Sequence, residues 1–308
     1  MATTMNKDSK IYIAGHRGLV GSAIHRKLVN EGYTNIIMQT SGELDLTDRE
    51  AVLKYFNMQK PEYVFLTAAR AGGVLALSQN KIDSLIDNFE IQTSVLIASA
   101  MYNVKKLLFI GSNCMYPKLA SEPLKEEYIG AGKLEPTTEF YALAKIAGLK
   151  LCQAYNEEAK TNFITAIPVN LYGENDKYDL TKAHVMPALL KKFKEAKESG
   201  ASLVEVWGTG MAKREFMHSD DLADACLFLM ENHTGSEPVN VGSGDNISIK
   251  ALAENIKFLV GYKGDIVYNT DMPDGISSKL LDSSKLYAMG WKPKVILSEG
   301  IMKVYRSL

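Results

Sequence analysis

The sequence has little cysteine, little net charge and no long apolar run, and each of these shortages excludes a class of protein. Three cysteines (Cys114, Cys152 and Cys226) in 308 residues fit neither a disulfide framework nor a zinc cluster of the Cys-x-x-Cys type, so no metal site is expected. The formal charge is −1, which argues against nucleic acid or an anionic membrane as a partner. The opening MATTMNKDSK contains no apolar segment and no run of about 18 apolar residues follows, so we expect a cytoplasmic protein.

Short apolar segments alternate with longer amphipathic ones along the first half of the chain. The β-rich segments are KIYIA from Lys10, NIIM from Asn35, YVFL from Tyr63, KLLFI from Lys106 and FITAI from Phe163. Strands that alternate with helices predict an α/β fold of the Rossmann type, a doubly wound parallel sheet. We predict a dinucleotide-binding domain over residues 1–170 with 209–235 packed on it. Residues 171–208 and 236–308 would form a smaller α/β substrate-binding lobe.

A glycine triplet, Gly15-x-x-Gly18-x-x-Gly21, follows the first expected strand and precedes an amphipathic helical pattern. Glycine permits a tight turn, lets the backbone approach a pyrophosphate, and lets the helix pack closely on the strand. A helix N-terminus also favours the negative charge of the phosphates. The triplet alone is a weak signal, but its position at the first strand-to-helix turn predicts dinucleotide binding.

The residues after the second expected strand favour NADPH over NADH. An acidic residue usually holds the ribose 2′-hydroxyl of NAD at this place, and the sequence has Gln39, Thr40 and Ser41 there instead. Arg17, inside the glycine loop, can meet a 2′-phosphate, although it fits an ordinary surface charge equally well. Asp45, followed by Leu46, is placed to contact adenine, and an aspartate here is also a common helix N-cap.

Tyr141 and Lys145 are spaced by four residues, so both side chains lie on one face of a helix. An ammonium near a phenol lowers the phenol's pKa, which would make Tyr141 a proton donor or acceptor for a carbonyl/alcohol couple. The alternative is a partly buried aromatic residue beside a solvated cation. The motif also follows a dinucleotide-type glycine loop and Ser112 after the fourth expected strand, and this combination makes a reaction centre the better interpretation.

Gly15, Gly18, Gly21, Ser112, Tyr141 and Lys145 together resemble the signature of the extended short-chain dehydrogenase/reductases. Longer segments are similar to the GDP-L-fucose synthase family within that group. They are IAGHRGLVGSAI, KKLLFIGSNCMYPK, LEPTTEFYALAKIAGLKLCQAYN, NLYG, HVMPALL, VWGTGMAKREFMHSDD, VNVGSG and PDGISSKLLD, which span residues 10 to 282. The resemblance implies a homodimeric, NADPH-dependent enzyme that inverts C3 and C5 of a GDP-4-keto-6-deoxymannose-type sugar and then reduces C4.

The resemblance also implies roles for individual residues. Cys114 and His184 would be the base and acid of epimerisation, Ser112 and Tyr141 would face the keto oxygen, and Lys145 would support Tyr141 and the nicotinamide ribose. NADP(H) would contact Gly15, His16, Arg17, Gly18, Leu19, Val20, Gly21, Ser41, Asp45, Leu46, Ala68, Ala69, Lys145, Pro168, Asn170, Leu171 and His184. Taken singly, a cysteine or histidine in such apolar surroundings is more often a packed or capping residue.

The GDP end of the substrate requires cations for the diphosphate and a flat surface for the base. The resemblance places it against Asn170, Lys192, Trp207, Arg214, Asp274 and Lys279. Lys192 lies in the charge-rich KKFKEAKE, which is also typical of a solvated helical face, and Trp207 also suits a core position.

Three segments depart from the family pattern. RAGG, from Arg70, replaces the usual KVGG; the YG of YGENDKYDLTKAH is not followed by Pro; and Ser41 stands where an Arg is common. These changes leave open a related GDP-4-keto-6-deoxy sugar such as a heptose, and they weaken the preference for NADPH. A reductase without epimerase activity and a non-catalytic NADP-binding regulator are further alternatives.

Overall fold

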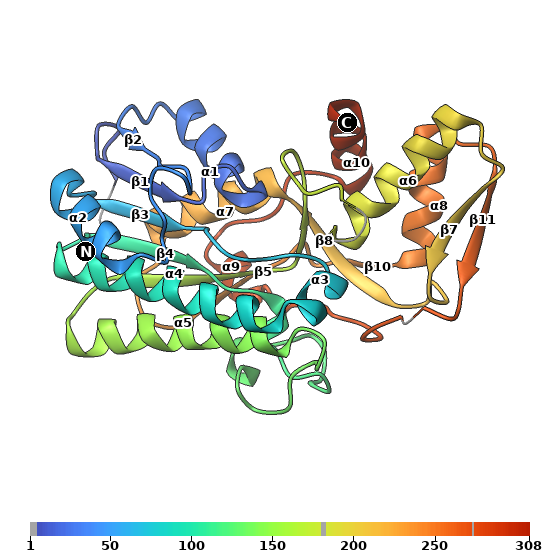
Figure 1. Cartoon of the computed structure of the whole chain (residues 1–308). Helices are drawn as coiled ribbons and strands as arrows, with labels where there is room; N and C mark the ends of the chain where they lie inside the picture. Colours follow the sequence, from blue (N-terminus) through green and yellow to red (C-terminus); the bar gives the residue numbers. More distant parts are fainter. Residues whose placement is uncertain (1–4, 180–182, 273) are drawn as a thin grey trace.

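A six-stranded parallel sheet is the centre of the larger part of the protein (Figure 1). The computed structural model describes residues 5–179, 183–272 and 274–308. The strand order of the sheet is β2-β1-β3-β4-β5-β9. The strands are β1 (Ile11–Ala14), β2 (Ile36–Ile37), β3 (Tyr63–Leu66), β4 (Lys106–Ile110), β5 (Phe163–Pro168) and β9 (Val239–Val241). All neighbouring pairs are parallel, which confirms the predicted doubly wound sheet.

Helices cover both faces of this sheet. The helices α1 (Leu19–Asn30) and α7 (Ser219–Asn232) pack on one face, where they share an apolar cluster with Ile11 and Ile13. The other face is covered by α2 (Arg49–Gln59), α4 (Lys81–Met101) and α5 (Glu139–Glu158), whose cluster includes Tyr12 and Ala14. Because both faces are buried, the strands read as continuous apolar runs.

A second apolar core lies beside the large sheet, at the right of Figure 1. It is formed mainly by α6 (Val185–Ser199), α8 (Ile249–Val260), α10 (Leu297–Ser307) and the parallel pair β7 (Leu203–Trp207) and β11 (Asp265–Asn269). A three-stranded sheet of β6 (Asn170–Tyr172), β8 (Lys213–His218) and β10 (Asn246–Ser248) connects the two parts of the chain. Four short elements complete the fold: α3 (Val74–Gln79), α9 (Ser284–Ala288) and the 3₁₀ turns η1 (Asn113–Met115) and η2 (Glu126–Tyr128).

The chain passes between the two parts more often than the sequence suggests. Strand β9, from the range 236–308 assigned to the smaller lobe, is an edge strand of the large sheet. Strand β8, from the range 209–235 assigned to the larger domain, pairs with β6 and β10. Strands of three to six residues carry no local sign of their partner, so the two-lobe division stays a proposal with interleaved boundaries.

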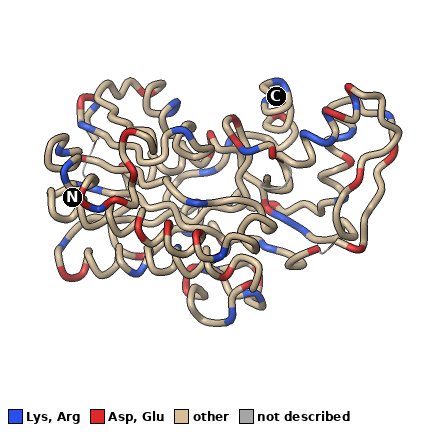
Figure 2. The backbone as a smooth tube through the Cα atoms, in the orientation of Figure 1, with Lys and Arg blue, Asp and Glu red and all other residues tan. Residues whose placement is uncertain are grey.

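Acidic and basic residues are interspersed along the whole backbone, as expected from the near-zero net charge (Figure 2). Among the residues that the structure describes, no helix combines the length and apolarity needed to cross a bilayer.

Lys106, the first residue of β4, is fully buried and caps a neighbouring helix. Its Nζ donates hydrogen bonds to the carbonyl oxygens of Leu229 (3.0 Å), Met230 (2.6 Å) and His233 at the C-terminus of α7. Burial lowers the pKa of Lys106 to about 8. The lysine therefore fixes α7 against β4, the strand that leads to Ser112.

We expect Lys106→Met to lower the free energy of unfolding by about 1–3 kcal/mol, because it leaves buried carbonyl groups without a donor. Urea denaturation measures this change. The control is Lys105→Met, which removes an exposed ion pair with Glu62 and should cost less than about 1 kcal/mol. Equal losses in the two variants would contradict the capping role.

Candidate active site

The glycine loop leaves the sheet at its topological switch point. Strands β1 and β3 are neighbours, while the chain runs from β1 to β2 on one side and from β3 to β4 on the other. Ligands of open α/β sheets bind at such points, outside the carboxyl ends of the strands. The loop that begins at Gly15 follows β1, and Ala68 and Ala69 follow β3 at the same edge.

The glycines of this loop are required by its geometry. Gly15 has a φ of +91°, and a Cβ there would lie 2.7 Å from backbone atoms of Ala68. A Cβ at Gly21 would lie 2.3 Å from the Gly15 carbonyl oxygen. Gly18 is the N-cap of α1, and no side chain caps this helix. The first turn of α1 therefore offers uncapped N–H groups to a phosphate, and the loop fits a dinucleotide.

The chain after β2 suits the 2′-phosphate of NADP(H). Ser41 and Arg17 are both exposed, and the charge of Arg17 helps to lower the pKa of Glu43, so the guanidinium lies near this segment. The Glu43 carboxylate itself accepts hydrogen bonds from the N–H and hydroxyl of Thr40, each at 2.8 Å. Asp45 is exposed and accepts two hydrogen bonds from Thr47.

The sequence allows two roles for Asp45, a contact with adenine and the N-cap of a helix. The N-cap of α2 is Asp48, whose carboxylate accepts a hydrogen bond from the Ala51 N–H at 3.0 Å. The N-cap alternative for Asp45 is therefore wrong, and its contact with adenine stays a prediction. Leu46 packs against the apolar cluster on this face of the sheet.

Three segments bring Ser112, Tyr141 and Lys145 together. Ser112 follows β4 and is the N-cap of the turn η1, while α5 carries Tyr141 and Lys145. The side chains of Ser112 and Tyr141 lie close enough for the Ser112 hydroxyl to lower the pKa of the phenol. The Lys145 Nζ donates to the carbonyl oxygen of Ile110 at 2.8 Å and lies 4.7 Å from the centroid of the Phe109 ring. The lysine is thus fixed by the end of β4.

The pKa of Tyr141 differs from the prediction made from the sequence. Burial and the charge of Cys114 raise this pKa above 10.0, against a lowering contribution from the Ser112 hydrogen bond. The Lys145 Nζ lies 5.9 Å from the Tyr141 ring centroid, and burial lowers the pKa of Lys145 to about 7. The expected lowering of the Tyr141 pKa by the ammonium is therefore wrong for the free protein. A phenol that stays protonated is suited to donate a proton.

Cys114 differs in its surroundings from the other two cysteines. It is half-buried in the turn η1, its N–H donates to the Ser112 hydroxyl at 3.2 Å, and its Sγ lies 3.8 Å from the Asn113 side-chain oxygen. Cys152 and Cys226 are buried, and burial raises the pKa of both thiols. Cys114 is thus the thiol that belongs to the Ser112–Tyr141 group.

His184 comes from a different part of the chain, the N-cap position of α6. Its side chain keeps an exposed surface, while nearby protein atoms and the charge of Lys177 lower its pKa below 6.5. A pKa below its usual range favours the neutral imidazole, which can accept a proton. Its segment reaches the sheet edge through Lys177, whose Nζ donates to the Ala71 carbonyl oxygen at 3.2 Å.

The other expected cofactor residues lie in the glycine loop, at the start of α1 and around the end of β5. His16 belongs to the glycine loop, and Leu19 and Val20 begin α1. Pro168 ends β5, and Asn170 and Leu171 lie in β6. The side chain of Asn170 donates to the Glu215 carbonyl oxygen at 3.0 Å, so it holds β6 against β8.

Two of the expected substrate residues form a cation–aromatic pair. The Lys192 Nζ lies 5.5 Å from the centroid of the Trp207 ring and donates to the Glu205 carbonyl oxygen at 2.9 Å. Trp207 is partly exposed on β7. The pair offers a flat surface and a cation side by side, as a nucleotide requires.

The remaining three substrate candidates are Arg214, Asp274 and Lys279. They lie within residues 274–279 or bond to them. Arg214 donates to the carbonyl oxygens of Ile276 (2.6 Å) and Asp274 (3.3 Å). The Asp274 carboxylate accepts from the N–H and hydroxyl of Thr209, so it closes a turn. The Lys279 Nζ donates to the Asn113 carbonyl oxygen at 3.1 Å. Lys279 is therefore a contact of the turn that carries Cys114.

Sequence reasoning missed two residues that organise this edge. Asn88, buried on α4, accepts from the N–H of Arg70 (3.0 Å) and donates to its carbonyl oxygen (3.1 Å). Lys177 makes the contact with Ala71 described above. A polar residue in an otherwise apolar helix is a weak signal for Asn88, and no spacing singles out Lys177.

The chain matches known proteins over nearly its whole length. The model of the NAD dependent epimerase/dehydratase family matches residues 11–242. The putative GDP-L-fucose synthase 2 of Arabidopsis thaliana is 50% identical over 98% of this chain and 92% of that protein. Among solved structures, a GDP-6-OMe-4-keto-L-xylo-heptose reductase from C. jejuni has a TM-score of 0.95 at 40% identity, with 99% of each chain covered. A GDP-mannoheptose C4 reductase from Campylobacter jejuni with NADP bound has a TM-score of 0.90 at 42% identity, with 98% of each chain covered.

These similarities confirm several predictions made from the sequence. The protein is an NADP(H)-dependent enzyme, and the resemblance to GDP-L-fucose synthases extends over the whole chain. The uncapped helix, the glycine geometry and the exposed Arg17 agree with that cofactor. The chain belongs to the NAD dependent epimerase/dehydratase family and, within it, to the GDP-L-fucose synthase group.

Proposed function

We propose that the protein converts GDP-4-keto-6-deoxymannose to GDP-L-fucose by inverting C3 and C5 and then reducing C4 with NADPH. The observation that carries this proposal is the Cys114 thiol in the same turn as Ser112, close enough to Tyr141 for its charge to raise the pKa of the phenol. A reductase needs Tyr141, Lys145 and Ser112 but has no use for a thiol there. The GDP-L-fucose synthases among its relatives support the same activity.

Epimerisation uses the acidity that a 4-keto group gives to its neighbouring carbons, C3 and C5. A base removes the proton from one face, and an acid returns a proton to the opposite face of the enolate. Cys114 and His184 are the two groups that we assign to these steps. They come from separate elements, the turn after β4 and the start of α6, as attack on two faces of one ring requires.

Reduction uses the second set of residues. The bound cofactor supplies a hydride to C4. Tyr141 donates its proton to the oxygen on C4, and the Ser112 hydroxyl holds that oxygen in place. Because burial keeps the pKa of Tyr141 high, the phenol is protonated before the step. Lys145, fixed on Ile110, orients the nicotinamide ribose beside Tyr141.

Recognition of the GDP group is assigned to the smaller part of the chain. Trp207 provides a surface for the base, and Lys192, Arg214 and Lys279 provide positive charge for the diphosphate. Asn170 lies between this region and the cofactor edge, because it belongs to β6 and bonds to β8. Asp274 acts indirectly by shaping the turn at Thr209.

A GDP-4-keto-6-deoxy heptose is the second candidate substrate. Two heptose reductases share the fold of this chain at TM-scores of 0.95 and 0.90. The segment from Arg70 to Gly73, which departs from the GDP-L-fucose synthase pattern, lies at the same sheet edge as the reaction groups.

The experiment follows NADPH absorbance with GDP-4-keto-6-deoxymannose and, separately, with its heptose counterpart. The product is then identified by NMR. We expect faster oxidation with the hexose and GDP-L-fucose as product. Faster turnover of the heptose would establish the second candidate, and tight NADPH binding without reduction of either sugar would favour a regulator.

We further propose a homodimer formed through α4 and α5. Both helices lie on one side of the large sheet in Figure 1. Exposed apolar side chains on them are Ile82, Ile86, Met101 and Leu143. Sedimentation equilibrium should give a mass of two chains, and substitution of Ile86 by Asp should shift it toward one.

A cytoplasmic location also remains a proposal. All three cysteines are free, and Cys114 must stay a thiol to act in epimerisation. A reducing compartment meets that requirement.

A further inference from the structure

The segment that joins β6 to α6 carries His184 and is fixed at its beginning by ion pairs. The Glu174 carboxylate lies 2.9 Å from Arg26 on α1 and 3.2 Å from Lys303 on α10. Both cations also pair with Asp220, the second residue of α7. Glu174 and Asp220 lie near His218 in a group that resembles a metal site, but Arg26 and Lys303 already balance the carboxylates. This group is therefore an anchor for the segment.

Lys177 bonds the same segment to the loop that follows β3. Its Nζ donates to the Ala71 carbonyl oxygen at 3.2 Å, and its backbone N–H donates to the Asp176 carboxylate at 2.7 Å. The acceptor is well fixed, because buried Asn88 holds both backbone groups of Arg70, the residue before Ala71. The bridge thus spans from the segment of His184 to the loop that follows β3.

The charge of Lys177 also reaches His184. Apart from burial, Lys177 is the group whose charge lowers the pKa of the imidazole. The neighbouring Asp176 is also buried, which raises the pKa of its carboxyl to about 6, while the hydrogen bond and the charge of Lys177 lower it. One lysine therefore bonds the preceding segment to the loop after β3 and also brings its charge to the imidazole.

We propose that Lys177 is a positioning residue for His184, which it holds over the sugar ring by bridging the segment before α6 to the loop after β3. This inference rests on the proposed function, since it assigns a task within epimerisation. Lys177 acts through His184 and not on the hydride transfer, for which Ser112, Tyr141 and Lys145 suffice. Its loss should therefore slow proton exchange on the sugar and leave cofactor binding unchanged.

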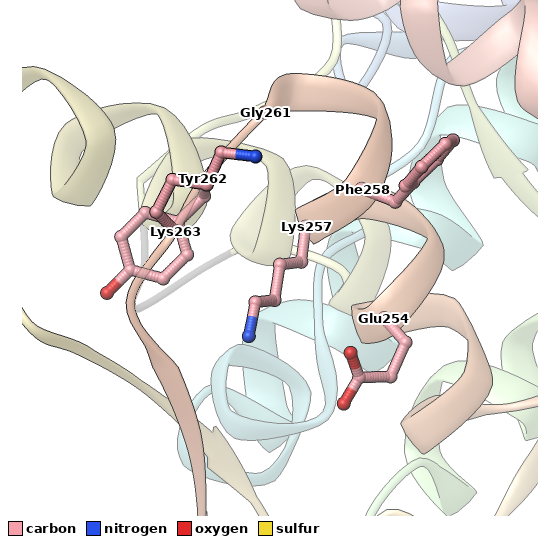
Figure 3. A pocket seen from close by; sticks show the side chains of 6 residues that line it. All are labelled: Glu254, Lys257, Phe258, Gly261, Tyr262 and Lys263. Atoms are coloured by element: carbon pink, nitrogen blue, oxygen red, sulfur yellow. The ribbon is translucent and has the colours of Figure 1, made fainter.

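The test compares Lys177→Met and Lys177→Arg with the wild-type enzyme and with Lys263→Met. Lys263 is an exposed lysine in a surface hollow at the end of α8, lined by Glu254, Lys257, Phe258, Gly261, Tyr262 and Lys263, so its substitution also removes one charge (Figure 3). Deuterium incorporation from D₂O at C3 and C5 of the sugar is measured with NADP⁺ bound. NADPH oxidation is measured separately with ordinary NADPH and with NADPH that carries deuterium at the transferred position. Fluorescence titration gives the Kd for NADPH.

We expect Lys177→Met to slow deuterium incorporation by about 10- to 100-fold, the size expected when a reacting group is misplaced by about 1 Å. Replacing the transferred hydrogen of NADPH by deuterium should then no longer slow NADPH oxidation, because proton transfer becomes slower than hydride transfer. The Kd for NADPH should stay within twofold of the wild-type value. Lys177→Arg should restore most of the exchange, and Lys263→Met should behave as wild type.

Two results would overturn the role of Lys177 without affecting the proposed function. One is deuterium incorporation by Lys177→Met at the wild-type rate. The other is a loss of NADPH affinity as large as the loss of deuterium incorporation, which would mean that the bridge supports cofactor binding. A wild-type enzyme that incorporates no deuterium would overturn the proposed function and this inference with it. The wild-type measurement therefore separates the two failures.

Discussion

Tyr141→Phe is expected to slow NADPH oxidation by about 10²–10⁴-fold, the usual contribution of a positioned proton donor. The phenol is buried and held protonated by its raised pKa, and we assign it as the proton donor to the oxygen on C4. Stopped-flow absorbance with saturating sugar measures the change. Deuterium exchange at C3 and C5 should fall much less, because Cys114 and His184 are unchanged.

The matched control for this substitution is Tyr155→Phe. Tyr155 lies on the same helix, α5, and packs on Phe163, away from Ser112. Removal of its hydroxyl should leave NADPH oxidation within twofold of wild type. If Tyr141→Phe retained oxidation within threefold, the assignment of Tyr141 as proton donor would be wrong.

Cys114→Ser is expected to lower deuterium exchange by about 10²–10⁴-fold at one carbon or at both. A serine hydroxyl keeps the size and the hydrogen bonds of the turn, but it loses its proton far less readily than a thiol. NMR of the sugar in D₂O reports each carbon separately. The pattern would also show whether Cys114 acts at C3, at C5 or at both.

The control for the thiol is Cys152→Ala. Cys152 is buried on α5, where burial raises its pKa to about 12, so it packs as a small apolar side chain. Its loss should leave exchange unchanged in the folded enzyme. Normal exchange in Cys114→Ser would exclude the thiol from the reaction and favour a reductase that lacks epimerase activity.

The large sheet was predictable from the sequence because its strands are buried on both faces. Runs such as YVFL, and KLLFI after its first residue Lys106, are apolar or aromatic on both faces of the strand, which is typical of a parallel sheet between helices. Gly15 and Gly21 were predictable for a related reason, since their positions leave no room for a Cβ. Local sequence determined these features, and the structure agrees with it.

Features that depend on distant contacts were not predictable in the same way. Strand β9 joins β5 across about seventy residues of intervening chain, and a three-residue strand does not specify its neighbour. The raised pKa of Tyr141 depends on how tightly η1 covers α5, which the spacing to Lys145 does not report. The bridge from Lys177 to Ala71 joins residues 106 positions apart.

Some associations within the candidate site were likewise predictable from the sequence, and others were not. Ser112, Tyr141 and Lys145 lie on elements that pack together, so their association followed from the strand and helix pattern. Lys279 was expected at the nucleotide, and the structure adds a bond from it to Asn113 in the catalytic turn. His184 stands on a separate element, and its approach to the sugar ring is a proposal that proton exchange can test.

The most direct test of the account is one turnover of the wild-type enzyme with GDP-4-keto-6-deoxymannose and NADPH in D₂O, followed by NMR of the product. Cys114 and His184 acting through an enolate predict GDP-L-fucose with deuterium at both C3 and C5 and hydrogen from NADPH at C4. A C4-reduced product without deuterium at either carbon would contradict the account and would leave the protein as a reductase.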